Sequence, residues 1–545
     1  MERAIRFAIC LIIISLMAAP AIIIISLMAA PAASAATYYI AASGLDSSSG
    51  ASKTAPWLHA PGMTGCSSNC ASYTPQAGDQ FIFRGGDTWH TSTGSPIGLP
   101  WTWSWSGSSG NPIYIGVDQT WYSGGSWTRP ILTYDNPATT SQPSSCTYAD
   151  DGQTAFSLGY GSSGQTYVTF DNFEITGWCW ATGNQSAVTV FGGNHNTLSN
   201  CYFHGWSMST AATGDNFSMV EGNLPGGNYL LITQNVFDGS DSTFGTNTAS
   251  PHTGEVIYNT GAEVSFNVFN NVSNVMVNEA PHIHDNIFEN VFEPLNDSPH
   301  GNIWELNGAS GTTGEIFLYN NLEIGGNVGV GFDANFTGAG LHIFNNVVVT
   351  LGNTGSSTTA NCWMIEGGGT QSADIHNNTM STGCTLPRMV TNWNGAVTFE
   401  NGHYIGYSPA TLATTYSACC TYTVTDNGGE LFQTASVASG QGYTTSNNYA
   451  PTSSSGSTVG AGNNMTSACN AMPAPTPTYA TNPVTSCKAG FQGVTYNTSN
   501  HTAVPNAAGN ARPSSGAWDV GAYQYAGSST PQKPNPPTGL SVTVQ

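Results

Sequence analysis

The strongest constraint on the fold is a six-residue pattern that recurs eight times through the middle of the chain. The copies place apolar residues around a third position that is usually polar and most often asparagine. Successive copies start 28, 34, 32, 19, 35, 25 and 32 residues apart. Such spacing is typical of one structural turn per copy, with loops of different length inserted. The copies are FDNFEI at 170, LSNCYF at 198, ITQNVF at 232, VSFNVF at 264, IHDNIF at 283, LYNNLE at 318, IFNNVV at 343 and IHNNTM at 375.

Short β-branched and aromatic runs bounded by Gly and Asn predict strands, because no long segment has the apolar period of an amphipathic helix. Asparagine suits a corner between strands, since it tolerates left-handed backbone angles and can hydrogen-bond to an asparagine in the next turn. One turn cannot bury its apolar face alone, so turns stack at roughly 4.8 Å and share a core. The repeat therefore predicts an all-β chain that folds as a single-stranded right-handed parallel β-helix, a solenoid.

Three further segments resemble a known superfamily. TYYIAASGLDSSSG at 37, AGDQFIFRGGDTW at 77 and WDVGAYQY at 518 are similar to the opening, first-coil and closing segments of secreted bacterial β-helix proteins of the pectate-lyase-like superfamily. The resemblance spans residues 37–526 and implies the same fold. The superfamily contains polysaccharide lyases, glycoside hydrolases, epimerases and non-catalytic surface proteins, so the fold alone does not choose the reaction.

The domain organisation follows from the repeat and the resemblance. Residues 37–526 form one β-helix domain, with an N-terminal cap because the end of a stack otherwise exposes apolar core and unpaired strand edges. A Pro-rich linker or tail follows at 527–545. Within the domain we expect the cap and first coils at 37–110, the regular body at 111–400, and irregular C-terminal coils at 401–526.

The first 36 residues predict an export signal. Arg3 and Arg6 precede an apolar run over 7–30, and small residues at 33–35 form an A-x-A cleavage pattern. The mature protein is therefore expected to be secreted and to be extracellular or at the cell surface. We also expect it to be a monomer. A duplicated IIISLMAAPA lengthens the apolar run, so an uncleaved membrane anchor is the alternative. We expect no membrane insertion once the signal is removed.

The charge balance restricts the partners. Nine Lys and Arg face 31 Asp and Glu, and between Arg129 and Arg388 the only basic side chains are histidines. This excludes nucleic acid, whose phosphates require a basic footprint. A neutral extracellular polysaccharide fits, and an anionic one could bind through bridging Ca²⁺, the candidate cofactor that the sequence suggests.

Eleven cysteines remain once Cys10 is removed with the signal. In an exported chain they predict disulfides with one thiol left over. Zinc spacing is poor, because no C-x-x-C pair occurs. The expected local pairs are Cys66 with Cys70, Cys179 with Cys201, Cys362 with Cys384, and Cys469 with Cys487.

Two segments that share Ser-Pro-His provide the candidate catalytic residues. SPHTGE at 250 and the segment from 297 to 305 both lie in long intervals between hexads, where the extra residues form loops on which sites are usually built. Glycoside hydrolysis needs two carboxylates across a cleft. The candidate carboxylates are Asp297, Glu305 and Glu255, with His300 and His252 as proton-transfer or binding groups. The candidate substrate-binding residues are Trp304, Asp238, Asp241 and His282.

Other interpretations of these residues stay open. The shared Ser-Pro-His can mark a loop that returns to the stack, with its His and Glu facing solvent. Elimination of the pectate-lyase kind commonly uses Arg or Lys as base, and the chain has neither between Arg129 and Arg388, so hydrolysis is placed ahead of elimination. A histidine or tyrosine base stays open for elimination. The rival class is a non-catalytic surface or adhesive protein.

His282 and His284 form an H-x-H segment in the fifth hexad. In a strand both side chains share a face, so with Asp285 they could bind a transition metal. The interpretation preferred from sequence places Asp285 at the corner and His284 at an exposed position, as His376 is in its hexad. No metal ligand is therefore predicted.

Overall fold

The structure is a computed structural model in which the described residues from Thr37 onward belong to one compact unit. The structure describes residues 35–526 with gaps. The gaps are 92–93, 138–142, 149–153, 160–163, 182–188, 210–217, 223–228, 242–254, 259–261, 273–274, 279–280, 292–303, 308–314, 325–331, 336–339, 350–360, 363–364, 367–370, 382–385, 388, 391–392, 410–422 and 476–480.

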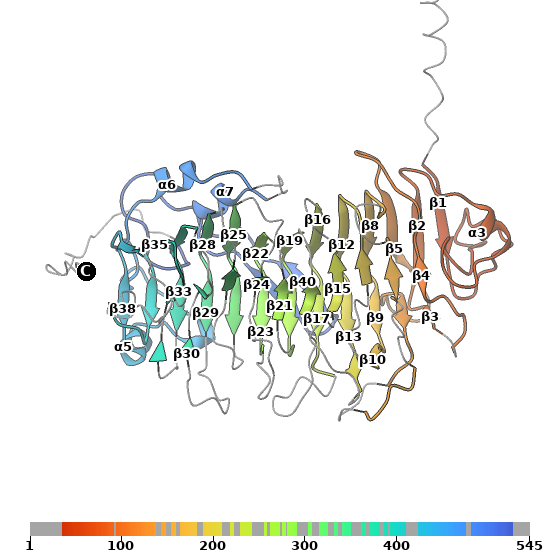
Figure 1. Ribbon diagram of the computed structural model, residues 1–545, viewed down its shortest axis with the longest axis horizontal. Helices are drawn as coiled ribbons and strands as arrows, with labels where there is room; N and C mark the ends of the chain where they lie inside the picture. The colour runs from red at the N-terminus through yellow and green to blue at the C-terminus, as the bar shows by residue number, and fades with distance from the viewer. Residues whose placement is uncertain are drawn as a thin grey trace, which may run out of the picture. The chain divides into compact units, whose positions relative to one another are not determined.

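Three long parallel sheets contain most of the strands of the described residues (Figure 1). Sheet A contains β1 (Thr37–Ile40), β2 (Gln80–Gly85), β5 (Ile113–Tyr122), β8 (Val168–Asp171), β12 (Asn196–Ser199), β16 (Leu230–Thr233), β19 (Ala262–Ser265), β22 (His282–His284), β25 (Ile316–Tyr319), β28 (Leu341–Phe344), β32 (Ala373–His376), β35 (Ala396–Glu400) and β37 (Thr423–Asp426). Sheet B contains β4 (Trp101–Thr102), β7 (Phe156–Ser157), β11 (Thr189–Phe191), β15 (Ser218–Gly222), β18 (Glu255–Tyr258), β21 (Val275–Asn278), β24 (Trp304–Asn307), β27 (Phe332–Asn335) and β31 (Ile365–Glu366). Sheet C contains β3 (Thr88–His90), β6 (Ile131–Thr133), β9 (Glu174–Thr176), β13 (Tyr202–His204), β17 (Val236–Asp238), β20 (Val268–Asn270), β23 (Ile287–Glu289), β26 (Leu322–Ile324), β29 (Val347–Val349), β33 (Thr379–Ser381), β36 (His403–Ile405) and β38 (Leu431–Gln433).

The remaining elements are short. The other strands are β10 (Cys179–Trp180), β14 (Ser207–Met208), β30 (Asn361–Cys362), β34 (Leu386–Pro387), β39 (Val494–Asn497) and β40 (Thr502–Pro505). The helices are α3 (Ser68–Ser72), α5 (Ala435–Gly440), the 3₁₀ helix η4 (Thr445–Asn447), α6 (Thr466–Ala471) and α7 (Pro483–Cys487).

The order of the strands confirms the predicted β-helix. Within each sheet, neighbouring strands follow one another in chain order from coil to coil, and each turn of the body visits sheets A, C and B. Pairing within the three sheets is parallel throughout, as in Leu230–Ala262 and Ile283–Leu318. Because crossovers between parallel strands of one sheet are right-handed in almost all proteins, a right-handed β-helix is the expected hand. The stack continues to β38, past residue 400.

The eight hexads lie at the corner between sheets A and C. Their third residue has left-handed backbone angles in every case, including Asn172 at φ 71° and Asp285 at φ 57°. Even Phe266, which is not favoured in this region, has φ 55°. The prediction of a left-handed corner is confirmed, and the backbone angle is common to all copies although the side chain is not.

The asparagines that hydrogen-bond from coil to coil occupy the fourth hexad position, whereas we expected those of the third. In each pair the Nδ2 group donates to the Oδ1 atom of the next asparagine at 3.0 or 3.1 Å. These side chains are buried and also donate to backbone carbonyls, as Asn346 does to Leu318 at 2.9 Å. We call them the asparagine ladder: Asn235, Asn267, Asn286, Asn321, Asn346 and Asn378.

Cys201 occupies the ladder position in the coil before Asn235. Its backbone N–H donates to Asn235 Oδ1 at 2.9 Å, and its buried thiol is free. The predicted Cys179–Cys201 disulfide is therefore wrong, and Cys179 pairs with Cys146. The predicted pairs Cys66–Cys70 and Cys469–Cys487 are confirmed. The predicted Cys362–Cys384 pair lies outside the described side chains.

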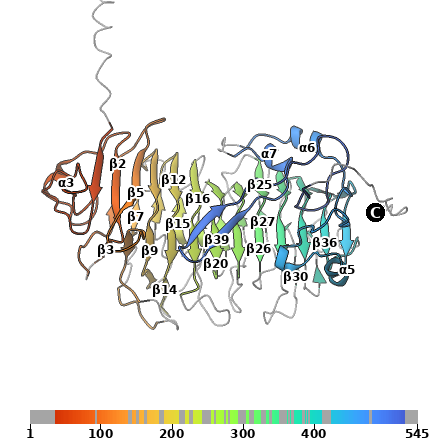
Figure 2. The same cartoon turned by 180° about the vertical axis from the view of Figure 1, so that it is seen from behind.

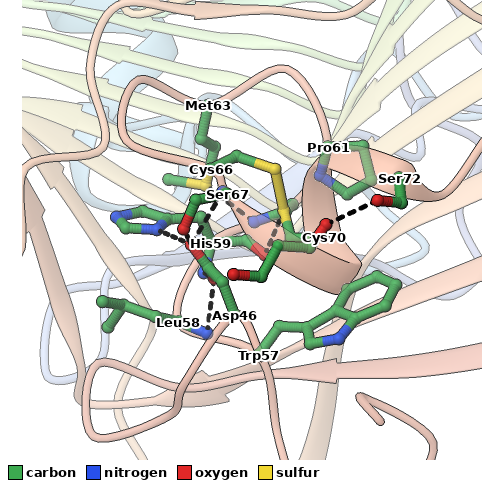
Figure 3. The surroundings of a disulfide bond; sticks show 12 residues. Asp46, Trp57, Leu58, His59, Pro61, Met63, Cys66, Ser67, Cys70 and Ser72 are labelled. Carbon is green, nitrogen blue, oxygen red and sulfur yellow. Dashed lines mark hydrogen bonds and ion pairs between the residues drawn. A yellow bond between two sulfur atoms is a disulfide. The ribbon is translucent and has the colours of Figure 1, made fainter. Parts of the chain in front are cut away.

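An N-terminal cap closes the first coil (Figure 3). The buried Asp46 carboxylate accepts hydrogen bonds from the backbone N–H groups of His59 and Ser67 and pairs with His59 Nδ1 at 2.8 Å. The Cys66–Cys70 disulfide lies beside this cluster. These contacts hold the loop that covers the apolar end of the stack.

The described residues of the C-terminal segment, 460–475 and 481–525, lie along the outside of the stack. Figure 1 shows α6 and α7 beside the later strands of sheet A, from β25 to β35, and Figure 2 shows the β39–β40 hairpin crossing the stack on the other side. The buried Arg129 donates to the backbone carbonyls of Asn500 and His501, and Tyr496 donates to Asp238 at 2.6 Å. Residues distant in sequence thus cover parts of sheets A and C.

Among the described residues, no helix is both long enough and apolar enough to span a bilayer.

One carboxylate lies in the apolar core. The inward column of sheet C stacks Phe237, Phe269 and Phe288 at 5.1 and 5.0 Å, and the next residue in register is Glu323. Glu323 is 2% exposed, and within the described part of the chain neither carboxylate oxygen has a hydrogen-bond partner. Burial raises the pKa of Glu323 to about 8, so the side chain stays protonated at neutral pH.

We expect Glu323→Gln to flatten the pH dependence of stability. An unfolded glutamate ionises near its ordinary pKa of 4.5, while the folded one keeps its proton up to about 8. Folding then takes up a proton, so this group makes the free energy of unfolding fall with rising pH, by roughly 1.4 kcal/mol per pH unit. Urea unfolding of both proteins between pH 5 and 8 checks this, and parallel pH profiles would contradict it.

Candidate functional site

The outer face of sheet B carries three acidic residues on neighbouring strands. Glu305 of β24 pairs in register with Asp333 of β27, and Asp333 pairs with Glu366 of β31. Paired positions on neighbouring strands lie roughly 4.8 Å apart. We call these three positions the acidic row.

Strand alternation places the acidic row on the outer face. Trp304 and Ile365, which directly precede Glu305 and Glu366, are fully buried in the core. Successive residues of a strand alternate between the two faces of a sheet, so Glu305 and Glu366 occupy strand positions of opposite parity to these core residues. Like charges directly opposite one another destabilise a sheet. Stability of the sheet therefore does not account for the row.

Further polar residues extend the same register toward the N-terminal coils. Asn278 of β21 pairs with Glu305, and Glu221 of β15 pairs with Tyr258 of β18. Glu221 follows the buried Val220 and is itself 7% exposed. A polar strip thus runs along the outer face of sheet B from β15 to β31.

Glu255 lies on the same sheet as Glu305 but is not in its row. Glu255 pairs with Ser218 and Val275, whereas Glu305 pairs with Asn278. The register row of Glu255 and that of Glu305 are three residues apart, which is roughly 10 Å along the strands. Because three is an odd number, the two positions alternate in the strand pattern rather than coincide. The structure does not bring these two predicted carboxylates together.

Both Ser-Pro-His segments lead into strands of sheet B. The first ends three residues before β18 and the second four residues before β24. The shared motif therefore precedes equivalent elements of the repeat. Asp297, His300 and His252 lie outside the described residues.

Trp304 cannot stack on a sugar as predicted. Its side chain is 0% exposed and belongs to the core cluster, because its strand position faces inward. The pattern of aromatic followed by acid made both residues candidates, but the face that each occupies separates their roles.

Asp238 and Asp241 lie on sheet C and its following turn, away from the acidic row. Asp238 is 3% exposed, and it accepts hydrogen bonds from Asn270 and from Tyr496 of the C-terminal hairpin. Its role in substrate binding stays a prediction, and the hairpin covers the side chain in this structure. Asp241 pairs instead with His204.

His282 lies on a third face. It is on the outer side of sheet A, and it is buried together with His284 beneath the C-terminal segment. The predicted exposure of His284 and His376 is also wrong, since both are at most 1% exposed. The sequence-derived candidates therefore spread over all three sheets.

Asp333, Glu366 and Glu221 were not predicted as site residues from the sequence. A signal was available, since the pattern aromatic, acid, any, Asn in WELN at 304 recurs as FDAN at 332. Met-Val-Glu-Gly at 219 likewise recurs as Met-Ile-Glu-Gly at 364. In these repeats an acid directly follows an apolar residue, and the apolar residues Trp304, Val220 and Ile365 are buried in the core. Carboxylate oxygens are also the ligands that Ca²⁺ prefers, so the acidic row is where the candidate cofactor would bind.

A second charged cluster lies on sheet C. His204 bridges two carboxylates, with Nδ1 2.6 Å from Asp241 Oδ2 and Nε2 3.0 Å from Glu174 Oε1. Burial alone would lower the pKa of His204, but the hydrogen bonds to Asp241 and Glu174 outweigh it and raise the pKa to about 9. The His204 imidazolium on β13 thus links to β9 through Glu174 and to the turn after β17 through Asp241. Both ring nitrogens take part in these contacts.

No protein-family model matches the chain, and no curated protein matches its sequence. Several solved structures are similar in fold. One is a GH136 lacto-N-biosidase from Eubacterium ramulus, at 12% identity and TM-score 0.40, covering 72% of this chain and 68% of that one. Another is the pectate lyase Pel9A, at 15% identity and TM-score 0.38, covering 78% and 91%. A third is the PL6 family polysaccharide lyase Pedsa3628 from Pseudopedobacter saltans, at 12% identity and TM-score 0.35, covering 66% and 89%. The three sheets themselves establish the fold, and these likenesses transfer no reaction to this chain.

His204→Gln should change stability in a pH-dependent way. The raised pKa means that the ion pairs stabilise the fold fully below the ordinary pKa of 6.5, and that the stabilisation is lost as pH rises through about 9. The difference in urea unfolding midpoint between wild type and variant should therefore be large near pH 6 and small near pH 10. A difference that does not vary with pH would contradict the charged bridge.

Proposed function

We propose that the protein binds an extracellular polysaccharide along the outer face of sheet B and hydrolyses it with carboxyl groups of the acidic row. The observation that supports this is the register of Glu305, Asp333 and Glu366 on three neighbouring strands. A row of like charges costs stability, so a function that uses the charges explains why the sequence has them.

The spacing of the row suits glycoside hydrolysis. Retaining enzymes hold their two carboxyl groups about 5 to 5.5 Å apart, and inverting enzymes about 6.5 to 9.5 Å apart. Neighbouring positions in the row are roughly 4.8 Å apart and alternate positions roughly twice that, measured between backbones. One carboxyl group would protonate the leaving oxygen, and a second would attack the sugar or activate water.

The sheet also restricts elimination chemistry. The strands of sheet B from β11 to β31 lie between Arg129 and Arg388, where the sequence contains no Lys or Arg. A base for elimination on these strands would have to be His or Tyr. Tyr258, in register with Glu221, is the one observation that favours a lyase as the second candidate.

The substrate would be neutral, or anionic with bridging calcium. The chain has a formal net charge of −22, and the acidic row adds a local negative field that repels free polyanions. The three described disulfides fit the export that the signal predicts, since disulfides persist in oxidising compartments. We therefore place the reaction outside the cytoplasm, consistent with the expected secretion.

The test is a panel of neutral and acidic polysaccharides, with and without calcium, assayed for new reducing ends and for the ultraviolet absorbance of unsaturated products. Reducing ends without absorbance are expected. Asp333→Asn, Glu305→Gln and Glu366→Gln should each be compared with wild type, and removal of a general acid or base should lower kcat by roughly 10²- to 10⁴-fold.

Glu289→Gln is the matched control, because Glu289 is a partly exposed strand glutamate on sheet C. It should retain activity. Unsaturated products would favour the lyase candidate with Tyr258 as base. Binding without any product would overturn the enzyme in favour of a non-catalytic surface protein, and equal losses in Glu289→Gln would remove the acidic row from the mechanism.

A further inference from the structure

Three buried side chains converge on the outer face of sheet A. Glu263 of β19 lies in register with His282 of β22, and His284 shares the face of His282 because Ile283 between them faces the core. His284 Nε2 lies 3.0 Å from Glu263 Oε1, and His282 Nδ1 lies 4.0 Å from Glu263 Oε2. The three ligand atoms are all within 4.8 Å of one another.

Neighbouring groups orient both imidazole rings. Asp285 Oδ2 lies 2.8 Å from His284 Nδ1, which directs Nε2 toward Glu263. Tyr319 Oη lies 3.0 Å from His282 Nε2, which directs Nδ1 toward the same carboxylate. Histidines that bind metals commonly donate their second ring N–H to a carboxylate or other acceptor in this way.

The C-terminal segment closes the cluster. Thr481 Oγ1 donates to Glu263 Oε1 at 3.1 Å, and the Gly493 N–H donates to Asp285 Oδ1 at 2.9 Å. The side chains of both histidines are 0% exposed, and that of Glu263 is 4% exposed. The cluster is thus buried between two parts of the chain that lie more than 200 residues apart in sequence.

We propose that Glu263, His282 and His284 bind a divalent transition-metal ion of the zinc type. Two imidazole nitrogens and one carboxylate oxygen are a donor set that zinc accepts, and the Thr481 hydroxyl or a water supplies the fourth ligand. Ligands at about 2.0 to 2.1 Å from a tetrahedral ion lie about 3.3 Å from one another. The two distances of 3.0 and 4.0 Å bracket this value.

The geometry assigns Asp285 a different role from that considered from sequence alone. It does not face the convergence of ligand atoms, because its two oxygens are directed at His284 Nδ1 and the Gly493 N–H. Asp285 is therefore a positioning residue. The proposed ion links sheet A to the C-terminal segment, which makes it structural rather than catalytic.

Metal binding should be measured on the full chain after chelator treatment and dialysis. Zinc chloride should bind with one tight site per chain in calorimetry and raise the Tm, and cobalt chloride should give the visible absorption of a tetrahedral N/O site. Glu263→Gln and His284→Gln should abolish the tight site. Asp285→Asn should weaken it by roughly 10- to 100-fold, as expected for the loss of a supporting contact.

His376→Gln is the matched control, since His376 is a buried histidine on the same face of sheet A. It should bind zinc as tightly as wild type. Near-ultraviolet circular dichroism verifies that each variant folds before titration. If wild type shows no tight site, or if folded Glu263→Gln binds zinc as wild type does, the cluster is a hydrogen-bonded ion pair and the proposal is overturned. Equal weakening in folded His376→Gln would also overturn it.

Discussion

A buried asparagine amide must satisfy its donors and its acceptor, and in this chain it does so in the neighbouring coils. Each member of the asparagine ladder binds the next through Nδ2 and Oδ1, and also binds backbone carbonyls at the corner between sheets A and C. A shift of one residue would leave these groups unsatisfied in the core, at a cost of about 1 to 3 kcal/mol for each. The ladder therefore fixes the register of successive coils at this corner.

Register at one corner determines which side chains form columns on each face. The inward column of sheet C stacks Phe237, Phe269 and Phe288, and the outward column of sheet A stacks His284 and Tyr319 at 4.8 Å. On sheet B the same stacking aligns Glu305, Asp333 and Glu366. Residues about 30 positions apart in sequence thereby become direct neighbours, which is how a solenoid can build one site from several repeats.

The sequence predicted the fold because the hexads carry both the left-handed corner and the alternation of apolar residues. It misplaced the ladder, although the fourth hexad position is asparagine in six copies while the third includes Gln234, Phe266 and Asp285. The site was harder to predict, because loops of variable length separate the hexads from sheet B and hide its register. The burial of His282 and Asp238 depends on Thr481, Gly493 and Tyr496, which no local pattern connects to them.

Engineered disulfides test the stacking of sheet B most directly. Cysteine pairs bridge when their Cα atoms lie about 4.4 to 6.8 Å apart. Under mild oxidation, peptide mapping of the double variant Glu305→Cys/Asp333→Cys should show a new cross-link, and so should Asp333→Cys/Glu366→Cys. The pair Glu305→Cys/Glu366→Cys, two strands apart, should remain reduced. Cross-linking of this last pair but of neither neighbouring pair would contradict the register on which the acidic row depends.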